Sequence, residues 1–172
     1  MSGKRALGIF NEAVSTIIGT TPIVDVPRKI AGCLPILLSE PDLLMKNETF
    51  APENAYSRNT IFECPKAKFS ILAMVWSSQC ETPIHDHPRW CTMGIYEGKI
   101  QEEEFCQKVA GEVELISQRT RREGEVSFLP SKSPNIHRIS NVSDKKAITI
   151  HIYGGSTTKL GPNVGSIYRL ST

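Results

Sequence analysis

Histidine and tyrosine side chains at alternate positions are the part of this sequence best suited to chemistry. His85 and His87 flank Asp86, and His151 stands two positions before Tyr153. Because successive side chains on a β-strand point to opposite faces, the members of each pair would share one face. Two imidazoles on one face can reach a single ion, and neutral imidazole is a common ligand for transition metals. The spacing therefore predicts a metal site lined by strands.

Three of the four histidines are predicted to bind the metal: His85, His87 and His137. Three ligands leave other positions on the ion open for reactants. A site of neutral imidazoles also keeps the full positive charge of a divalent ion, which suits an anionic thiolate. We reject Glu97 as a carboxylate ligand, because it lies beside a turn glycine, where a charge is usually solvated. The ligand set alone allows zinc as well as iron.

The segment from residue 147 to residue 153 has two different faces. Isoleucines alternate along one face, and Thr149, His151 and Tyr153 occupy the other. A strand in contact with water would carry Lys, Glu or Ser there, so an imidazole and a phenol predict an enclosed pocket inside a barrel. Since both neighbours on this face could hydrogen-bond to His151, we assign His151 to that role and not to the metal.

Arg58 precedes the first long β-patterned run. Its planar, permanently charged guanidinium could hold a substrate carboxylate through two hydrogen bonds. By position alone, a surface location is the more common outcome for such a residue. Three other arginines could replace or assist it: Arg89, Arg138 and Arg169.

Length and composition limit the class of protein. At 172 residues the chain fits one domain, and its net charge of +2 is scattered, which argues against nucleic acid as a partner. No apolar run approaches the ~20 residues of a transmembrane helix, and the first residues lack the apolar core of a signal peptide. We therefore expect a cytoplasmic protein with no membrane partner. Five cysteines without a CxxC pair predict reduced thiols.

The first third of the chain has a helical pattern. Apolar residues recur near a 3.6-residue period from residue 4 to residue 18 and predict a helix that ends at Gly19. A second helix is predicted to begin after Asp25, with Pro27 in its first turn, and to run past Leu34, where Pro35 would disturb any longer helix.

From about Tyr56 the pattern changes to short runs of β-branched and aromatic residues. We divide the chain into a helical segment, residues 1–55, packed on a barrel domain, residues 56–172. Short connections with Gly or Asp favour antiparallel hairpins, and the tail from residue 154 should be extended with little regular structure. The predicted strands are Lys68–Trp76, Cys91–Glu97, Ile100–Lys108, Glu112–Arg119, Glu125–Leu129, Ile136–Asn141 and Lys146–Tyr153.

An ordered set of motifs resembles the cysteine dioxygenase family, the thiol dioxygenases of the cupin superfamily. An HxH pair alone is common among cupins, whereas the joint occurrence of these motifs in this order is far more specific. The resemblance covers residues 56–155 and is to bacterial-type members. The motifs are Tyr56-Ser-Arg58-Asn, Pro-Ile-His85-Asp-His87, Cys91, His137-Arg138 and Thr149-Ile-His151-Ile-Tyr153.

The resemblance implies a mainly β fold, a cupin-like antiparallel β-barrel (double-stranded β-helix) with N-terminal α-helices. It implies that His85, His87 and His137 bind ferrous iron, Fe(II), and that Arg58 with Tyr56 positions the substrate carboxylate. In the family reaction both atoms of O2 are added to a thiol sulfur, giving a sulfinic acid without an external reductant.

Further roles also follow from the resemblance. Thr149, His151 and Tyr153 are similar to the family's hydrogen-bonded Ser-His-Tyr trio, and Tyr153 would orient the thiol and dioxygen. Some eukaryotic members join a cysteine to this tyrosine through a thioether bond, and Cys91 falls at about the matching position. The alternative for Cys91 is a free thiol that packs as a small apolar residue.

The resemblance also bears on the substrate. Several bacterial relatives oxidise 3-mercaptopropionate, typically with glutamine in the place of Arg58, so the arginine here favours L-cysteine and a role in cysteine catabolism. The alternatives are a 3-mercaptopropionate dioxygenase and a non-catalytic, metal-binding cupin that senses a small thiol or acid. A zinc-dependent hydrolase is more distant. We expect a small thiol and O2 as partners, and a monomer or small homo-oligomer.

Overall fold

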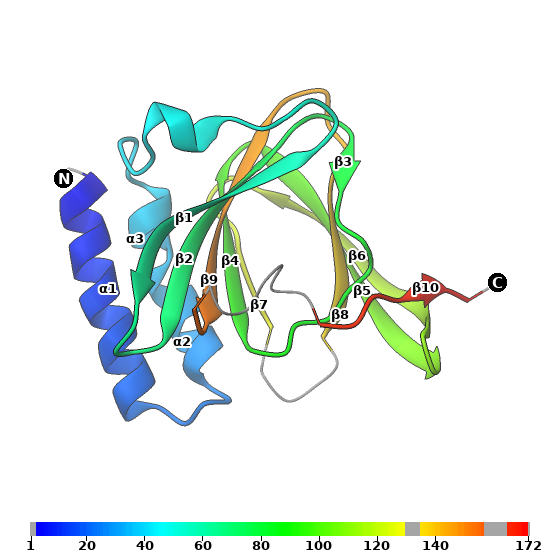
Figure 1. Ribbon diagram of the computed structural model, residues 1–172, viewed down its shortest axis with the longest axis horizontal. Coiled ribbons are helices and arrows are strands. Elements are labelled where there is room, and N and C mark those ends of the chain that lie inside the picture. The colour runs from blue at the N-terminus through cyan, green and yellow to red at the C-terminus, as the bar shows by residue number, and fades with distance from the viewer. Residues whose placement is uncertain (1–2, 130–134, 157–164, 172) are drawn as a thin grey trace.

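The computed structural model describes residues 3–129, 135–156 and 165–171. Two five-stranded sheets face each other, and the N-terminal helices cover the outer face of one of them (Figure 1). This arrangement confirms the predicted mainly β, cupin-like fold with N-terminal helices. Within the described residues, no helix has both the length and the apolar character needed to cross a membrane.

The helices follow the sequence pattern with one correction. The first predicted helix is α1 (Gly3–Thr20). The second does not continue past Leu34, because it divides into α2 (Val26–Cys33) and the short α3 (Pro35–Leu38). Pro35 has no N–H to bond the preceding turn, so a new helix begins there. A 3-10 helix, η1 (Lys46–Thr49), leads towards the sheets.

The first sheet has the strand order β1-β2-β9-β4-β7. All of its pairs are antiparallel. Its strands are β1 (Tyr56–Cys64), β2 (Phe69–Trp76), β9 (Ala147–Gly154), β4 (Cys91–Glu97) and β7 (Val126–Leu129).

Helices and first sheet are joined by a buried apolar layer. Phe10 and Val14 of α1 and Ile30 of α2 pack against Ile150 and the other outward-facing isoleucines of the sheet. The glycine of β4 is needed for this approach, because a Cβ on Gly94 would lie 2.7 Å from a methyl group of α3. The isoleucine face of β9 is thus the outer face, which leaves the opposite face for the barrel interior.

The second sheet has the strand order β10-β6-β5-β8-β3. Only the β10–β6 pair is parallel. Gly98 and Gly111, with φ of +78° and +82°, form the turns before and after β5, as predicted. The strands are β10 (Arg169–Leu170), β6 (Glu112–Arg122), β5 (Lys99–Val109), β8 (Ile136–Asn141) and β3 (Cys80–Glu81).

The strand predictions were incomplete. The predicted strands appear with small changes at their ends, but β1, β3 and β10 were missed. No clean alternation marks β1, because nearly all of its residues are only half-buried. In the predicted tail, residues 157–164 and 172 lie outside the described residues, and the rest contains only the two-residue β10. The division at residue 55 stays a prediction.

Candidate metal centre

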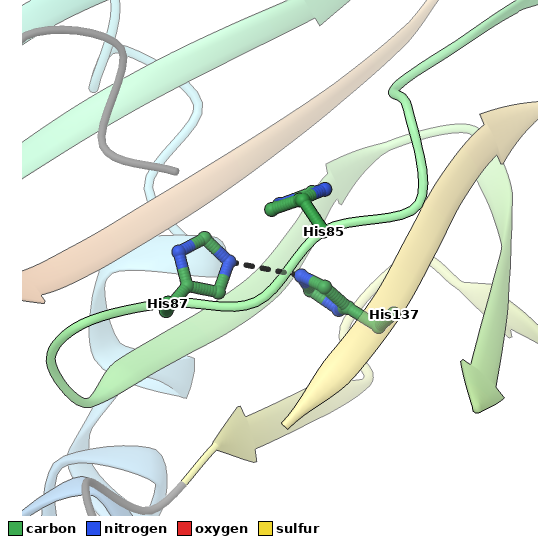
Figure 2. Close-up of side chains that lie close together, drawn as sticks. All are labelled: His85, His87 and His137. Carbon is green, nitrogen blue, oxygen red and sulfur yellow. Dashed lines mark hydrogen bonds between the residues drawn. The ribbon is translucent and has the colours of Figure 1, made fainter. Parts of the chain in front are cut away.

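The three histidines that the sequence selected lie together at one end of the barrel interior (Figure 2). One candidate ligand atom from each of His85, His87 and His137 lies within 4.8 Å of the others. The Nε2 atoms of His87 and His137 are 2.9 Å apart. Two ligands at right angles around an ion, with metal–nitrogen distances of about 2.0–2.1 Å, would be separated by nearly this distance. The geometry therefore fits a shared ion.

The segment that carries His85 and His87 is not the strand that the sequence predicted. Among the described residues, two isolated β-bridges are formed there, one between His85 and Ile167 and one between His85 and His137, whose backbone N–H groups each donate to the other's carbonyl oxygen at 2.9 Å. Pro83 and Pro88 cannot donate to a ladder, so regular pairing cannot extend along the segment. Both imidazoles still face the cluster, because the alternation holds locally at this bridge.

Hydrogen bonds and burial leave His85 ready to bind a metal. Its Nδ1 lies 2.8 Å from the Pro83 carbonyl oxygen, to which it donates, so the lone pair is on Nε2. Burial, reinforced by repulsion from His137, lowers the pKa of His85 to about 4. The imidazole is therefore neutral at pH 7, as a ligand must be.

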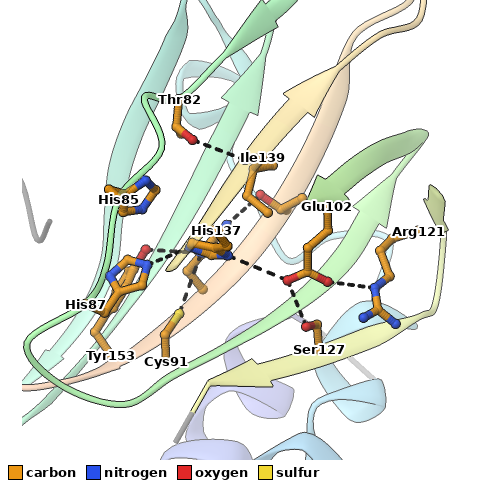
Figure 3. Close-up of polar contacts among 12 residues, drawn as sticks. Thr82, His85, His87, Cys91, Glu102, Arg121, Ser127, His137, Ile139 and Tyr153 are labelled. Atoms are coloured by element: carbon orange, nitrogen blue, oxygen red, sulfur yellow. Dashed lines mark hydrogen bonds and ion pairs between the residues drawn. The ribbon is translucent and has the colours of Figure 1, made fainter. Parts of the chain in front are cut away.

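A buried carboxylate that the sequence analysis missed lies behind His137. Glu102 is 2% exposed, and it accepts hydrogen bonds from Ser127 Oγ at 3.0 Å and Arg121 Nε at 2.8 Å (Figure 3). His137 Nδ1 lies 3.7 Å from Glu102 Oε1, beyond hydrogen-bond distance, and makes no hydrogen bond. Their attraction is therefore chiefly electrostatic, and it directs Nδ1 away from the cluster and Nε2 towards it.

Glu102 is ionised in spite of its burial. Burial alone would raise its pKa, but the nearby His137 and Arg121 outweigh that effect and lower the pKa to about 2. In the sequence it lies within a run of three glutamates, which resembles a solvated face. One sequence signal could have indicated that Glu102 is buried. It lies two residues after the apolar Ile100, and residues two apart on a strand share one face, which in β5 is the buried face.

The chemical face of β9 forms a continuous chain of hydrogen bonds. Thr149 Oγ1 lies 2.8 Å from His151 Nε2, and Tyr153 Oη lies 3.2 Å from His151 Nδ1. Trp76 donates its indole N–H to Thr149 Oγ1 at 2.9 Å. The Tyr153 ring is 5.5 Å from that of His87, so this chain reaches the histidine cluster.

The Trp76 indole is a fixed donor at one end of this chain. An indole can only donate, so the Thr149 hydroxyl accepts from it, while the direction of the Thr149 bond to His151 Nε2 depends on the imidazole tautomer. In the tautomer with its hydrogen on Nδ1, Thr149 donates to Nε2 and Nδ1 donates to Tyr153 Oη, which leaves the phenol proton for the pocket. Burial lowers the pKa of His151 to about 3 and raises the pKa of Tyr153 well above its ordinary value, so both are neutral.

Cys91 is close to this chain. It is the cross-strand partner of Tyr153 between β4 and β9, and its Sγ lies 3.9 Å from His151 Nδ1. Burial raises the pKa of the Cys91 thiol, which is therefore protonated.

Arg58 is the predicted arginine whose charge acts on the site. It lies half-buried on β1, and its positive charge contributes to the lowered pKa of both His85 and His151. Tyr56 lies on the same strand, with its ring centroid 4.9 Å from that of Trp76. The structure thus brings both predicted substrate-binding residues to the side of the barrel where the histidines lie.

The other candidates are placed elsewhere. Arg138 forms ion pairs with Glu103 at 2.6 Å and Glu81 at 3.6 Å, and Arg89 and Arg169 are exposed. The rejected Glu97 is 3.4 Å from Lys146 at the end of β4. Two hollows of about 280 and 430 Å³ lie on the outer surface and contain none of the three histidines, so the chemistry of the side chains locates the site better than cavity size.

Comparison with known families agrees with this geometry. The family model described as cysteine dioxygenase type I matches residues 39–159, which is more than half of the chain. The protein belongs to the cysteine dioxygenase type I family. The three-histidine cluster provides this family member with a candidate metal site.

Solved structures similar to this family member show the same fold. An uncharacterised conserved protein with a double-stranded β-helix domain from Klebsiella pneumoniae has a TM-score of 0.53 and 14% identity, over 76% of this chain and 93% of that one. A protein from Thermus thermophilus has a TM-score of 0.51 and 12% identity, over 64% and 92%. An oxalate oxidase has a TM-score of 0.50 and 20% identity, over 70% and 57%, so this chain spans just over half of its length.

Proposed function

We propose that this protein is an iron-dependent thiol dioxygenase that converts L-cysteine and O2 to cysteine sulfinate. One observation carries the proposal: a cluster of three buried or half-buried histidines lies beside Tyr153 and within the electrostatic reach of Arg58, in a chain of this family. The reaction balances without a further reductant, because both oxygen atoms are added to the thiol sulfur and nothing else is released.

His85, His87 and His137 would hold the iron through their Nε2 atoms. Ferrous iron, when bound there, would supply a positive charge that lowers the pKa of a thiol from about 8.5 and would bring sulfur and O2 together. The hydrogen bond of His85 to Pro83 and the attraction of His137 to Glu102 support this choice of ligand atoms. The negative charge of Glu102 stays behind His137, on the side of the imidazole that faces away from the cluster.

Arg58 would bind the substrate carboxylate. A guanidinium can donate two parallel hydrogen bonds to a carboxylate, which fixes the orientation of the substrate as well as its affinity. Tyr56, on the same strand, would contribute a hydroxyl beside it. The arginine favours L-cysteine in the proposal, because relatives that oxidise 3-mercaptopropionate typically carry glutamine in its place.

Tyr153 would orient the reacting thiol. We assign His151 the tautomer with its hydrogen on Nδ1, in which Thr149 donates to Nε2 and the phenol proton is free to donate into the pocket. Because burial keeps the phenol protonated, Tyr153 would act as a hydrogen-bond donor at neutral pH.

We also propose that Cys91 and Tyr153 form a thioether bond during turnover. Their positions opposite each other on adjacent strands support it. The bond joins Sγ to a ring carbon, with loss of the thiol S–H and one ring C–H, and the two hydrogens and their electrons reduce one O2 to H2O2. Mass spectrometry of the protein before and after turnover would find a loss of two hydrogens, and Cys91→Ser would abolish it. An unchanged mass would leave Cys91 as a packed free thiol.

The experiment that tests the function compares two thiols. The protein is loaded anaerobically with ferrous iron, and O2 uptake and sulfinate formation are followed with L-cysteine and with 3-mercaptopropionate. Saturable uptake that is faster with L-cysteine is expected. Faster uptake with 3-mercaptopropionate would instead make the protein a dioxygenase of that thiol. No O2 uptake with either thiol would favour a binding or sensing domain.

The Arg58→Gln variant tests the carboxylate contact in the same assay. We expect the KM for L-cysteine to rise at least tenfold, with a smaller change in kcat, because the lost contact is remote from sulfur. Arg119→Gln, a matched change of an exposed arginine on β6, should leave both parameters unchanged. An unchanged KM in Arg58→Gln would overturn the assignment.

A further inference from the structure

Residues 165–171, which we call the C-terminal strap, connect β6 to the segment between β3 and β4 that carries two of the candidate ligands. On β6 the strap is anchored by backbone hydrogen bonds. Arg169 N–H donates to the carbonyl oxygen of Gly111 at 3.0 Å, and Ser171 N–H donates to that of Val113 at 2.9 Å. The rest of the strap lies along the ligand-bearing segment, residues 82–90, which is distant in sequence from both the strap and β6.

Backbone hydrogen bonds make the C-terminal strap an outer strand for that segment. Tyr168 N–H donates to the carbonyl oxygen of Ile84 at 2.9 Å, and Asp86 N–H donates to that of Ser166 at 3.2 Å. Gly165 N–H donates to the Asp86 carbonyl oxygen at 2.9 Å. The opposite edge of the segment is bound to β8 by the bridge between His85 and His137 and, at its start, by the Thr82 N–H, which donates to the Ile139 carbonyl oxygen at 2.9 Å. The ligand-bearing segment therefore lies between β8 and the strap.

The Asp86 side chain adds a second set of contacts. It points away from the histidines, and its Oδ1 accepts the Ser166 N–H at 2.7 Å while Oδ2 accepts the Tyr168 hydroxyl at 2.8 Å. The strap approaches so closely that a Cβ on Gly165 would lie 2.1 Å from Asp86 Oδ1. An ionised carboxylate forms stronger hydrogen bonds than a neutral acceptor, so these two contacts are favourable ones.

We propose that Asp86 is a positioning residue for the metal: its carboxylate fastens the C-terminal strap to the ligand-bearing segment and so fixes His85 and His87. Without the strap, the described contacts that hold the segment to β8 would be the His85–His137 bridge and the hydrogen bonds between Thr82 and Ile139 at its start, because the two prolines prevent regular pairing along it. The ion would then have to order the segment as it binds, and that entropy would weaken its affinity. The inference rests on the metal site of the proposed function, but not on its substrate or reaction.

The test is the Asp86→Asn variant, which keeps the shape of the side chain and removes its charge. An amide oxygen can replace only one of the two acceptors, and the amide nitrogen would face a donor. The dissociation constant for Co²⁺, measured by chelator competition without thiol or O2, should rise about tenfold, in the range found when a group supporting a ligand is lost. The visible spectrum of bound Co²⁺ should change, and the Ser166 and Tyr168 amides should exchange faster with deuterium.

Two further variants keep the test decisive. Tyr168→Phe removes one donor, leaves the carboxylate intact and should show the same three effects at a smaller size, which decides the matter if Asp86→Asn does not fold. Asp144→Asn, at an exposed turn, should show none of them.

The proposal is overturned if strap exchange accelerates while Co²⁺ affinity and spectrum match the wild type. It is equally overturned if affinity falls while exchange in the strap is unchanged. Inactivity of the wild-type protein towards thiols, with all three effects present, would instead refute the proposed reaction and leave this inference standing.

Discussion

The two sheets contribute opposite kinds of groups to one site. The first sheet is covered by helices outside and by the second sheet inside, and every residue of β2 and β9 is buried. Its buried groups, Cys91, His151 and Tyr153, are all held neutral by burial, whereas the charged Arg58 on β1 is only half-buried. The second sheet contributes Glu102, which is as deeply buried but ionised, because Arg121 and His137 lie beside it.

This difference shows how a closed barrel can tolerate charge. An unpaired charge in the interior costs far more than a hydrogen-bonded neutral group, so the charge is found only where a cation from the neighbouring strand reaches it. In the proposed function, the first sheet would therefore supply hydrogen-bond donors to the substrate, and the second sheet would supply the electrostatic support for the metal. The following predictions test that division, beginning with the largest effect.

His137→Ala and His151→Gln should separate the two roles. His137→Ala is expected to lose bound iron and activity together, since one of three ligands is gone. His151→Gln should keep about one iron per chain, while activity falls about a hundredfold, because Tyr153 loses its orientation. Metal analysis measures the bound iron of each variant, and O2 uptake measures its activity. Full iron occupancy in His137→Ala would contradict the ligand assignment.

Glu102→Gln should weaken metal binding without removing it. The loss of the negative charge behind His137 is expected to raise the dissociation constant for iron about 10–100-fold, measured by chelator competition. The control is Glu103→Gln, a change of the next residue, which is also buried but pairs with Arg138. Equal losses in the two variants would mean that general destabilisation, and not the contact with His137, is responsible.

The metal-free protein should lose stability in two stages as the pH falls. The native pKa values of His85 and His151, about 4 and about 3, lie below the ordinary value, so below pH 6.5 the unfolded chain binds more protons than the native one. Each histidine then removes about 1.4 kcal/mol of stability per pH unit. Glu102, with its pKa lowered to about 2, adds stability above pH 4.5 that is lost as the pH falls from there towards 2.

Urea unfolding of the metal-free protein between pH 7 and pH 4 checks the first stage. In His151→Gln the unfolding free energy should fall less over this range than in the wild type. The difference should equal the contribution of one histidine, about 1.4 kcal/mol per pH unit below pH 6.5. The same pH dependence in both proteins would show that His151 is not held neutral by the first sheet.

The smallest predicted effect is that of Trp76→Phe. Removal of the indole N–H takes away one hydrogen bond to Thr149, worth about 1 kcal/mol, which corresponds to about fivefold in kcat if the chain to Tyr153 is affected. KM and iron affinity should stay close to those of the wild type. A loss of iron in this variant would mean that the first sheet supports the metal as well, against the division of roles.

Local patterns were enough to find much of the site. The alternation of Thr149, His151 and Tyr153 with isoleucines depends only on the period of a strand, and it correctly separated the chemical face from the outer one. The HxH spacing likewise brought His85 and His87 to one cluster, although the segment is not a regular strand. The second helix ends at Cys33 and not past Leu34, and its interruption at Pro35 agrees with the expectation that this proline disturbs a longer helix.

Contacts between distant residues were beyond the reach of such patterns. Trp76 and Thr149 are 73 residues apart, and Asp86 and Tyr168 are 82 apart. In the sequence, Asp86 was only the residue that points away from the metal, and Glu102 belonged to a run of charges. Their roles depend on which strand lies next to them, which no local period encodes.

The sequence by itself determined the ligand types, the faces on which they lie, the fold class and the family resemblance. It could do so because strand alternation and motif order are local properties of the chain. Only the tertiary structure decided which carboxylates support the cluster, which arginine faces it and how the chain's last residues hold the ligand-bearing segment. Those features depend on which strands pair and on which buried groups remain ionised. Both depend on contacts between strands that are formed only in the complete barrel.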